Sequence, residues 1–132
     1  MARWLAIVAC LAAATACGPP PASGDGGFDP ANPCAGGVPE DLPASCPNPV
    51  PSYRADVLPI LEQRCLPCHT PGSPLWALPD MSTYAAVYAD RGVILDQIAI
   101  CKMPNLGGGG APLTEPARQA VMGWLVCGAP DN

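Results

Sequence analysis

The chain has 132 residues, and its 19 Pro, 14 Gly and eight Cys are well above the usual share of these residues. Eleven acidic and six basic residues give it a formal net charge of −5. This charge, without any basic stripe, argues against a nucleic-acid-binding protein, and the length allows one small domain at most.

The N-terminus has the pattern of a secretion signal. Arg3 precedes an uncharged run, residues 4–16, in which Thr15 is the one polar side chain. These 13 residues are too few to cross roughly 30 Å of hydrocarbon as a helix. They match the apolar core of a signal peptide that ends in small residues. We therefore expect residues 1–16 to be a signal peptide.

Cys17 directly follows this run and is a candidate for lipidation. Small residues before Cys17 resemble a bacterial lipobox, although the usual Leu is missing at Ala14. Cleavage before Cys17 leaves seven cysteines in the mature chain. If two of them bind a cofactor and four form disulfides, one cysteine remains without a role. Diacylation would use that thiol. We expect a lipid-anchored protein of the cell envelope, facing the periplasm or the outer surface; ordinary secretion and a retained membrane anchor are the alternatives.

Residues 17–51 are expected to form a lipid-anchored tether. Pro and Gly fill 16 of the 34 positions from 18 to 51, and such a segment cannot bury a core of its own. We expect Cys34 and Cys46 to pair locally and to close a loop that stabilises the domain. Four cysteines are candidates for disulfides, and four cysteines permit three pairings, so spacing alone does not fix the connectivity. These four are Cys34, Cys46, Cys101 and Cys127.

Cys65-Leu66-Pro67-Cys68-His69 is the attachment pattern of c-type haem. Two thiols one helical turn apart can each add to a haem vinyl group, and the following imidazole can then bind the iron. His69 is the one histidine of the chain. A Cys-x-x-Cys pair also serves zinc binding and thiol–disulfide exchange, but zinc needs four suitable ligands and thioredoxin-like chemistry needs a preceding strand. Haem is therefore the favoured cofactor, and the other two chemistries stay open.

Around this motif we expect an all-α domain, residues 52–132, of about four short helices. Ser52 is a candidate N-cap for a first helix that starts near Tyr53 or near Asp56, with Pro59 in its first turn. Further helices are expected from 84 to 89, from 92 to 101, and from Thr114 to a stop at Gly128. The last helix carries an apolar stripe of Val121, Trp124 and Leu125, to which Met122 contributes. About 80 residues make a thin core, which a buried haem and disulfides would complete.

The loop from 70 to 80 is expected to shield the haem. It is rich in Pro and Gly, and its apolar residues Leu75, Trp76 and Leu78 are the candidates for a wall beside the cofactor. Trp76 is also a candidate donor to a haem propionate, although ordinary packing is the simpler role.

Met103 is the expected second axial ligand of an iron held by His69. Met81 lies 12 residues after His69, which makes crossing to the other haem face awkward, and Met122 belongs to the core stripe. Met103 follows a helix and opens a loop that contains residues 107–110, all Gly. Pro104 restrains Met103 to an extended backbone.

These features resemble a class I cytochrome c domain over residues 52–132, most closely the small bacterial kind found on secreted lipoproteins. The resemblance rests on Val57-Leu58-Pro59-Ile60-Leu61 before the haem motif, on Met103-Pro104, and on Trp124-Leu125 in the last helix. It implies covalent attachment of haem at Cys65 and Cys68 and axial ligation by His69 and Met103. It also implies that the first and last helices pack together, with Trp124 at the crossing.

Cys101 and Cys127 depart from the general pattern of that family. We expect them to pair, either to keep the loop of Met103 in place or simply to staple a small domain.

The predicted function is one-electron transfer with one haem c and His/Met ligation, not enzymatic catalysis. Scattered carboxylates offer no convincing general base. The expected partners are redox proteins of unknown identity, with no nucleic acid and with membrane contact through the lipid alone. The alternative is an open sixth site on the iron, in a subunit of an oxidoreductase or in a ligand sensor.

Overall fold

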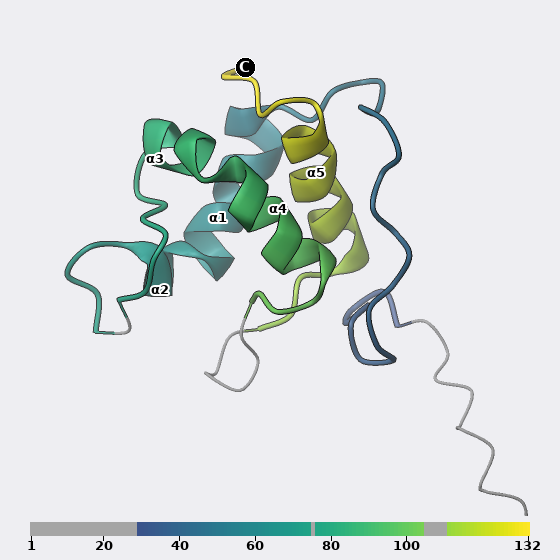
Figure 1. Ribbon diagram of the computed structural model, residues 1–132, viewed down its shortest axis with the longest axis horizontal. Coiled ribbons are helices and arrows are strands. Elements are labelled where there is room, and N and C mark those ends of the chain that lie inside the picture. Colours follow the sequence, from purple (N-terminus) through teal and green to yellow (C-terminus); the bar gives the residue numbers. More distant parts are fainter. Residues whose placement is uncertain (1–28, 75, 105–110) are drawn as a thin grey trace, which may run out of the picture.

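A computed structural model describes residues 29–74, 76–104 and 111–132 of the chain (Figure 1). Over these residues the protein is all-α and contains no strand, as expected. The described residues form five α-helices and one π-helical turn, more than the expected number of about four, partly because the Cys-x-x-Cys-His motif forms a short helix of its own. None of the helices in this described part is long and apolar enough to cross a bilayer.

The first helix begins with a widened turn. The π-helical turn η1, Tyr53–Val57, leads into α1, Leu58–Arg64, where Pro59 occupies the first turn. The Ser52 side chain accepts a hydrogen bond from the amide of Ala55 at 3.2 Å, so the predicted cap is confirmed. Pro59 has no amide hydrogen, so it is tolerated in the first turn of α1, directly after the wider turn η1.

Three further helices complete the bundle: α3, Tyr84–Ala89; α4, Arg91–Ala99; and α5, Glu115–Val126. Thr83 caps α3 by accepting a bond from the Ala86 amide at 3.2 Å. Thr114 is the N-cap of α5, as predicted, but its side chain makes no capping hydrogen bond. The first and last helices pack together, because Trp124 stacks on Tyr53 with 5.2 Å between the ring centroids.

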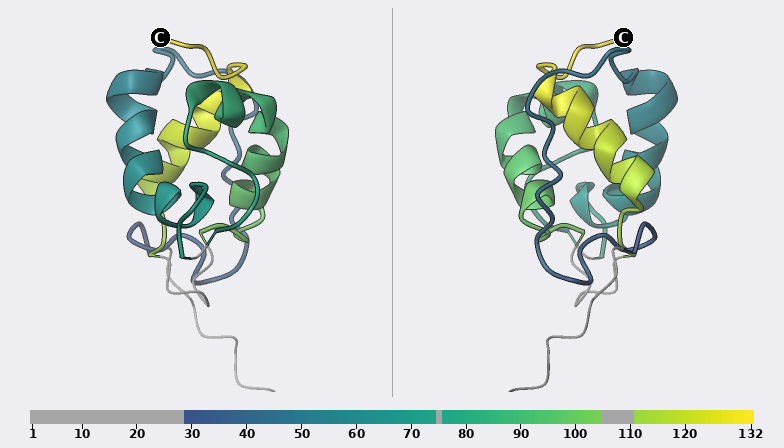
Figure 2. Two further views of the ribbon diagram at one scale, coloured as in Figure 1. Left: turned by 90° about the vertical axis from the view of Figure 1, so that its left-hand side faces the viewer. Right: turned by 90° about the vertical axis from the view of Figure 1, so that its right-hand side faces the viewer.

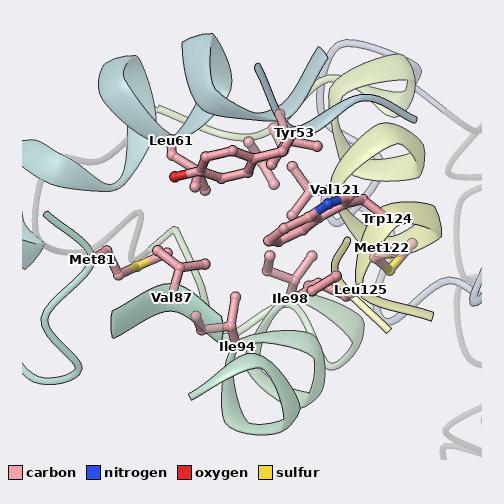
Figure 3. Packing of buried hydrophobic residues seen from close by; sticks show 13 residues of the cluster. Tyr53, Leu61, Met81, Val87, Ile94, Ile98, Val121, Met122, Trp124 and Leu125 are labelled. Carbon is pink, nitrogen blue, oxygen red and sulfur yellow. The ribbon is translucent and has the colours of Figure 1, made fainter. Parts of the chain in front are cut away.

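The core lies between these helices (Figure 3). Trp124 is fully buried and donates its indole N–H to the carbonyl of Pro130 at 2.9 Å. The predicted stripe of α5 faces inward. The buried apolar residues are Tyr53, Val57, Leu61, Met81, Val87, Ile94, Ile98, Leu113, Val121, Met122, Trp124, Leu125 and Ala129.

Two disulfides join Cys34 to Cys101 and Cys46 to Cys127, so both expected pairings, Cys34 with Cys46 and Cys101 with Cys127, are wrong. The segment of residues 29–51, here called the collar, runs beside α5 instead of closing on itself (Figure 2). An α-helix of 12 residues is about 18 Å long, whereas the Cα atoms of a disulfide lie within about 7 Å. Cysteines held near opposite ends of α5 therefore cannot pair with each other.

Gly123 allows the collar to approach α5 closely. A Cβ atom at Gly123 would lie 3.0 Å from Cγ of Pro47 and 3.6 Å from Cγ of Pro51. A larger side chain at this position would push the prolines away. The collar is thus attached by two covalent bonds and by close packing, while Cys17 and the rest of residues 1–28 lie outside the described residues.

Candidate functional site

One cavity of about 360 Å³ gathers the residues of the Cys-x-x-Cys-His motif. This volume lies within the range of roughly 300–1,000 Å³ that is usual for small-molecule and cofactor sites. The cavity is bounded by the end of α1, by α2 (Leu66–His69), by the loop that follows, by α4, and by the segments on either side of residues 105–110. Its apolar lining consists of Ala77, Leu78, Pro79, Met81, Val93, Ile94, Ile98, Met103, Pro104 and Leu113.

Cys65 and Cys68 line this cavity as free thiols. Cys65 ends α1 and precedes α2, and Cys68 lies within α2, so the two are one turn apart. Burial, and to a lesser degree the neighbouring Cys68, raises the pKa of the Cys65 thiol to about 11. Cysteines that exchange disulfides have a lowered pKa. This environment suits a thiol that forms one stable bond better than a redox-active pair.

His69 is held in the orientation that a metal ligand needs. Its side chain is buried, and Nδ1 lies 2.8 Å from the carbonyl oxygen of Pro79. Because a carbonyl oxygen can only accept, Nδ1 carries the hydrogen and donates it, so in the neutral ring the lone pair lies on Nε2. Two backbone bonds fix the intervening loop to α2: Ala77 N–H to Cys68 O at 2.9 Å, and Met81 N–H to His69 O at 2.8 Å.

The three methionines of the described chain lie in different places. Met103 and Met81 both line the cavity. Met81 belongs to the loop that hydrogen-bonds α2, whereas Met103 comes from the segment after α4. Met122 is fully buried in the core and does not line the cavity; Met81 and Met122 lie at opposite ends of the apolar cluster (Figure 3). Met103 is therefore the methionine that a separate element brings to the cavity of His69.

The expected wall of the loop from 70 to 80 is placed only in part. Leu78 lines the cavity although 79% of its surface is exposed, which puts it at the rim. Trp76 is exposed and is not among the lining residues. Leu75 lies outside the described residues. Much of the lining comes instead from α4, through Val93, Ile94 and Ile98. These residues were not predicted from the sequence, because the face that α4 turns to the cavity depends on tertiary packing.

An ion pair between the collar and α5 was not foreseen from the sequence. Arg118 is 1% exposed, and its Nε and Nη2 atoms donate to the two carboxylate oxygens of Asp41 at 2.5 and 2.8 Å. The available signal was its spacing: Arg118 lies three residues before Val121 and seven before Leu125, on the apolar stripe of α5. A cation at such a position requires a buried partner.

Comparison with protein-family models, with curated proteins and with solved structures found no match to this chain. In the described part of the chain, no three His, Cys, Asp or Glu side chains lie close enough together to hold a metal ion. A haem iron makes no such demand, because the protein supplies only its axial ligands. The residues that line the cavity fit that case: one oriented imidazole, one thioether from another element, and two thiols.

Proposed function

We propose that this protein is a one-electron carrier of the cell envelope, built on a small cytochrome c fold with one covalently attached haem. The observation that carries the proposal is the convergence of Cys65, Cys68, His69 and Met103 on one apolar cavity. These residues lie up to 38 positions apart in the chain, and they are the set that covalent attachment and two axial ligands require.

Each residue of this set has one role. Cys65 and Cys68 hold the cofactor through thioether bonds, His69 binds the iron through Nε2, and Met103 supplies the second axial ligand. Arg64, which also lines the cavity, places a cation beside the motif and is suited to a haem propionate. When bound, the haem takes up and releases one electron at its iron.

The surroundings favour electron transfer over bond chemistry. A thioether in the sixth position closes the iron to other ligands and raises its reduction potential, and an apolar cavity has the same effect on the potential. Hydrogen bonds hold the His69 ring and the backbone of Met103, which limits the rearrangement that accompanies a change of charge. The protein's own contribution is to bind, orient and exclude water.

The N-terminal pattern supports a place in the cell envelope. Residues 1–16, which contain the uncharged run 4–16, serve as the signal peptide, and diacylated Cys17 anchors the protein to a membrane. Redox proteins in the same compartment are its partners.

The proposal is tested by producing the protein with haem attachment in a bacterial periplasm and recording absorption spectra of the methionine variants. Met103→Leu should convert a low-spin, six-coordinate iron into one that is high-spin and binds CO. Met81→Leu and Met122→Leu are matched controls that should leave the spectrum unchanged. Absence of covalent haem would end the proposal, and an unchanged spectrum of Met103→Leu would remove the closed-site carrier in favour of another ligand.

A further inference from the structure

Met103 follows a helix end that is built in an unusual way. The amide of Lys102 donates to Gln97 O at 2.9 Å and the amide of Cys101 donates to Ile98 O at 3.0 Å, which is the pattern of a Schellman turn. Cys101 holds the left-handed position of this turn with φ of +58°, where glycine is the usual residue. The amide of Met103 also donates to Gln97 O, at 3.1 Å. The backbone of Met103 is therefore fixed to the end of α4.

The end of α4 is in turn held by Arg118 of α5. Arg118 donates through Nη1 to the carbonyl oxygen of Ile98 and through Nη2 to that of Ala99, at 2.9 Å for the latter. Carbonyls in the last turn of a helix lack the amide partner four residues later that the helix interior provides, so the Arg118 donors satisfy bonding capacity that remains there. A cation at this end also interacts favourably with the helix dipole. Asp41 neutralises this buried cation by a bidentate pair, so a collar residue completes the support.

The collar reaches the same place a second time through Cys34. Its disulfide to Cys101 lies two residues before Met103. A small cavity of about 20 Å³ is lined by Cys34, Cys101, Met103 and Arg118 together. Met103 thus lines the large cavity and also the small one, around which the disulfide and Arg118 lie.

We propose that the collar positions the sulfur ligand: the Cys34–Cys101 bridge and the Asp41–Arg118 pair hold the end of α4 so that Met103 stays on the iron. This inference rests on the proposed function, because it takes Met103 as the axial ligand. It gives residues 29–51 a role at the site, beyond stabilising the domain. Asp41, Cys34, Cys101 and Arg118 are positioning residues, since they act through Met103.

Imidazole offered to the ferric holoprotein measures how firmly Met103 is held, because imidazole binds only when the sulfur leaves. Cys34→Ala with Cys101→Gly removes the bridge while placing glycine in the left-handed position, so the turn itself is preserved. The dissociation constant for imidazole should fall at least about tenfold, since the fraction of open sites sets the apparent affinity. Asp41→Asn keeps both bridges and should lower the constant by about threefold or more for the same reason.

The second bridge provides the matched control. Cys46→Ala with Cys127→Ala removes a disulfide at the far end of α5 and should leave the imidazole constant within about twofold of the wild-type value. Met103→Leu gives the imidazole dissociation constant of an iron that has no sulfur ligand. If Met103→Leu binds imidazole tightly while the Cys34/Cys101 variant and Asp41→Asn match wild type, the positioning role is overturned and the proposed function stands.

Two other outcomes are also decisive. A fall of equal size in the Cys46/Cys127 control would show general loosening and overturn the positioning role. If Met103→Leu itself matches wild type, the proposed ligand set fails and this inference fails with it. If the Cys34/Cys101 variant does not yield folded holoprotein, Asp41→Asn decides the question.

Discussion

At the scale of single residues, environment separates cysteines that are chemically identical. Cys65 and Cys68 remain thiols beside the cavity, while four other cysteines are paired in disulfides. Desolvation keeps Cys65 protonated, because the buried site disfavours a thiolate. A protonated thiol is a poor nucleophile toward other disulfides, so this environment protects the motif from exchange with the structural bridges.

The raised pKa predicts slow alkylation of Cys65 in protein produced without haem. With a pKa of about 11 instead of the ordinary 9.0, the thiolate fraction at pH 8 falls on the order of 100-fold. The rate of reaction with iodoacetamide, followed at Cys65 by peptide mass spectrometry in a Cys68→Ala protein, should be well below the rate in urea, because desolvation, the larger cause of the raised pKa, remains in this variant. It should rise with pH up to about 11. Equal rates in the folded and unfolded protein would contradict the buried environment.

The Asp41–Arg118 pair predicts strong coupling in stability. Arg118→Met leaves Asp41 unpaired and removes the side-chain donor from the carbonyls of Ile98 and Ala99, so it should cost about 3–5 kcal/mol of unfolding free energy. The double variant with Asp41→Asn should be more stable than the sum of the single effects by about 1–3 kcal/mol. Urea unfolding of the four proteins measures this coupling. Additive effects would show that the pair is not a unit.

At the scale of elements, two helices end in the same turn with different residues. In α5 the amides of Gly128 and Ala129 donate to Leu125 O and Trp124 O, each at 3.0 Å, and Gly128 has φ of +84°. In α4 the corresponding left-handed residue is Cys101. The sequence therefore predicts the end of α5 correctly, because glycine signals it. The predicted helix from 92 to 101 runs two residues too far, because cysteine carries no such signal.

Gly92 and Gly128 form a matched pair for testing this account. A Cβ atom at either position meets nothing within 4 Å, so packing is not an issue. Gly128→Ala should destabilise the protein by about 1 kcal/mol because alanine resists the left-handed conformation. Gly92→Ala, within α4, should stabilise it by roughly 0.5–1 kcal/mol through helix propensity. Thermal unfolding reports both; a shift of the same sign in the two variants would contradict the assignment of the turn.

At the scale of the whole molecule, local patterns predict most of the helices and the four residues of the proposed haem site, but neither the α4 lining of the cavity nor the path of the collar. Residue spacing identified Cys65, Cys68, His69 and Met103, which the fold brings to one cavity. The disulfide partners depend on the contact of Pro47 with Gly123 and on the burial of Arg118, both of which join segments more than 70 residues apart. Such contacts leave no periodic signal in the sequence. The expected pairing of Cys34 with the nearby Cys46 was therefore wrong.

The disulfides interleave, and this predicts a need for isomerisation. Pairing cysteines in the order in which they leave the ribosome would join Cys34 to Cys46 first, which is not a native bridge. Export in a bacterial strain that lacks a disulfide isomerase should reduce the yield of native protein several-fold, as measured by mapping of disulfide-linked peptides. Replacing Cys46 and Cys127 together should restore most of the Cys34–Cys101 pairing. An unaffected yield would show that the collar folds onto α5 before oxidation.

Interleaved bridges also impose an order on biosynthesis. Cys65 and Cys68 lie between the partners of both disulfides, so each closed bridge encircles the stretch that receives the haem under the proposed function. If the proposed function holds, a newly exported chain has to keep the thiols of Cys65 and Cys68 reduced while the four cysteines of the disulfides are oxidised. Loading the cofactor before Cys34 meets Cys101 lets a large rigid ring enter while the wall that carries Met103 is still loose. Closing the Cys34–Cys101 bridge afterwards would be the final step of maturation, because it would fix the segment of Met103 over a cofactor that is already in place.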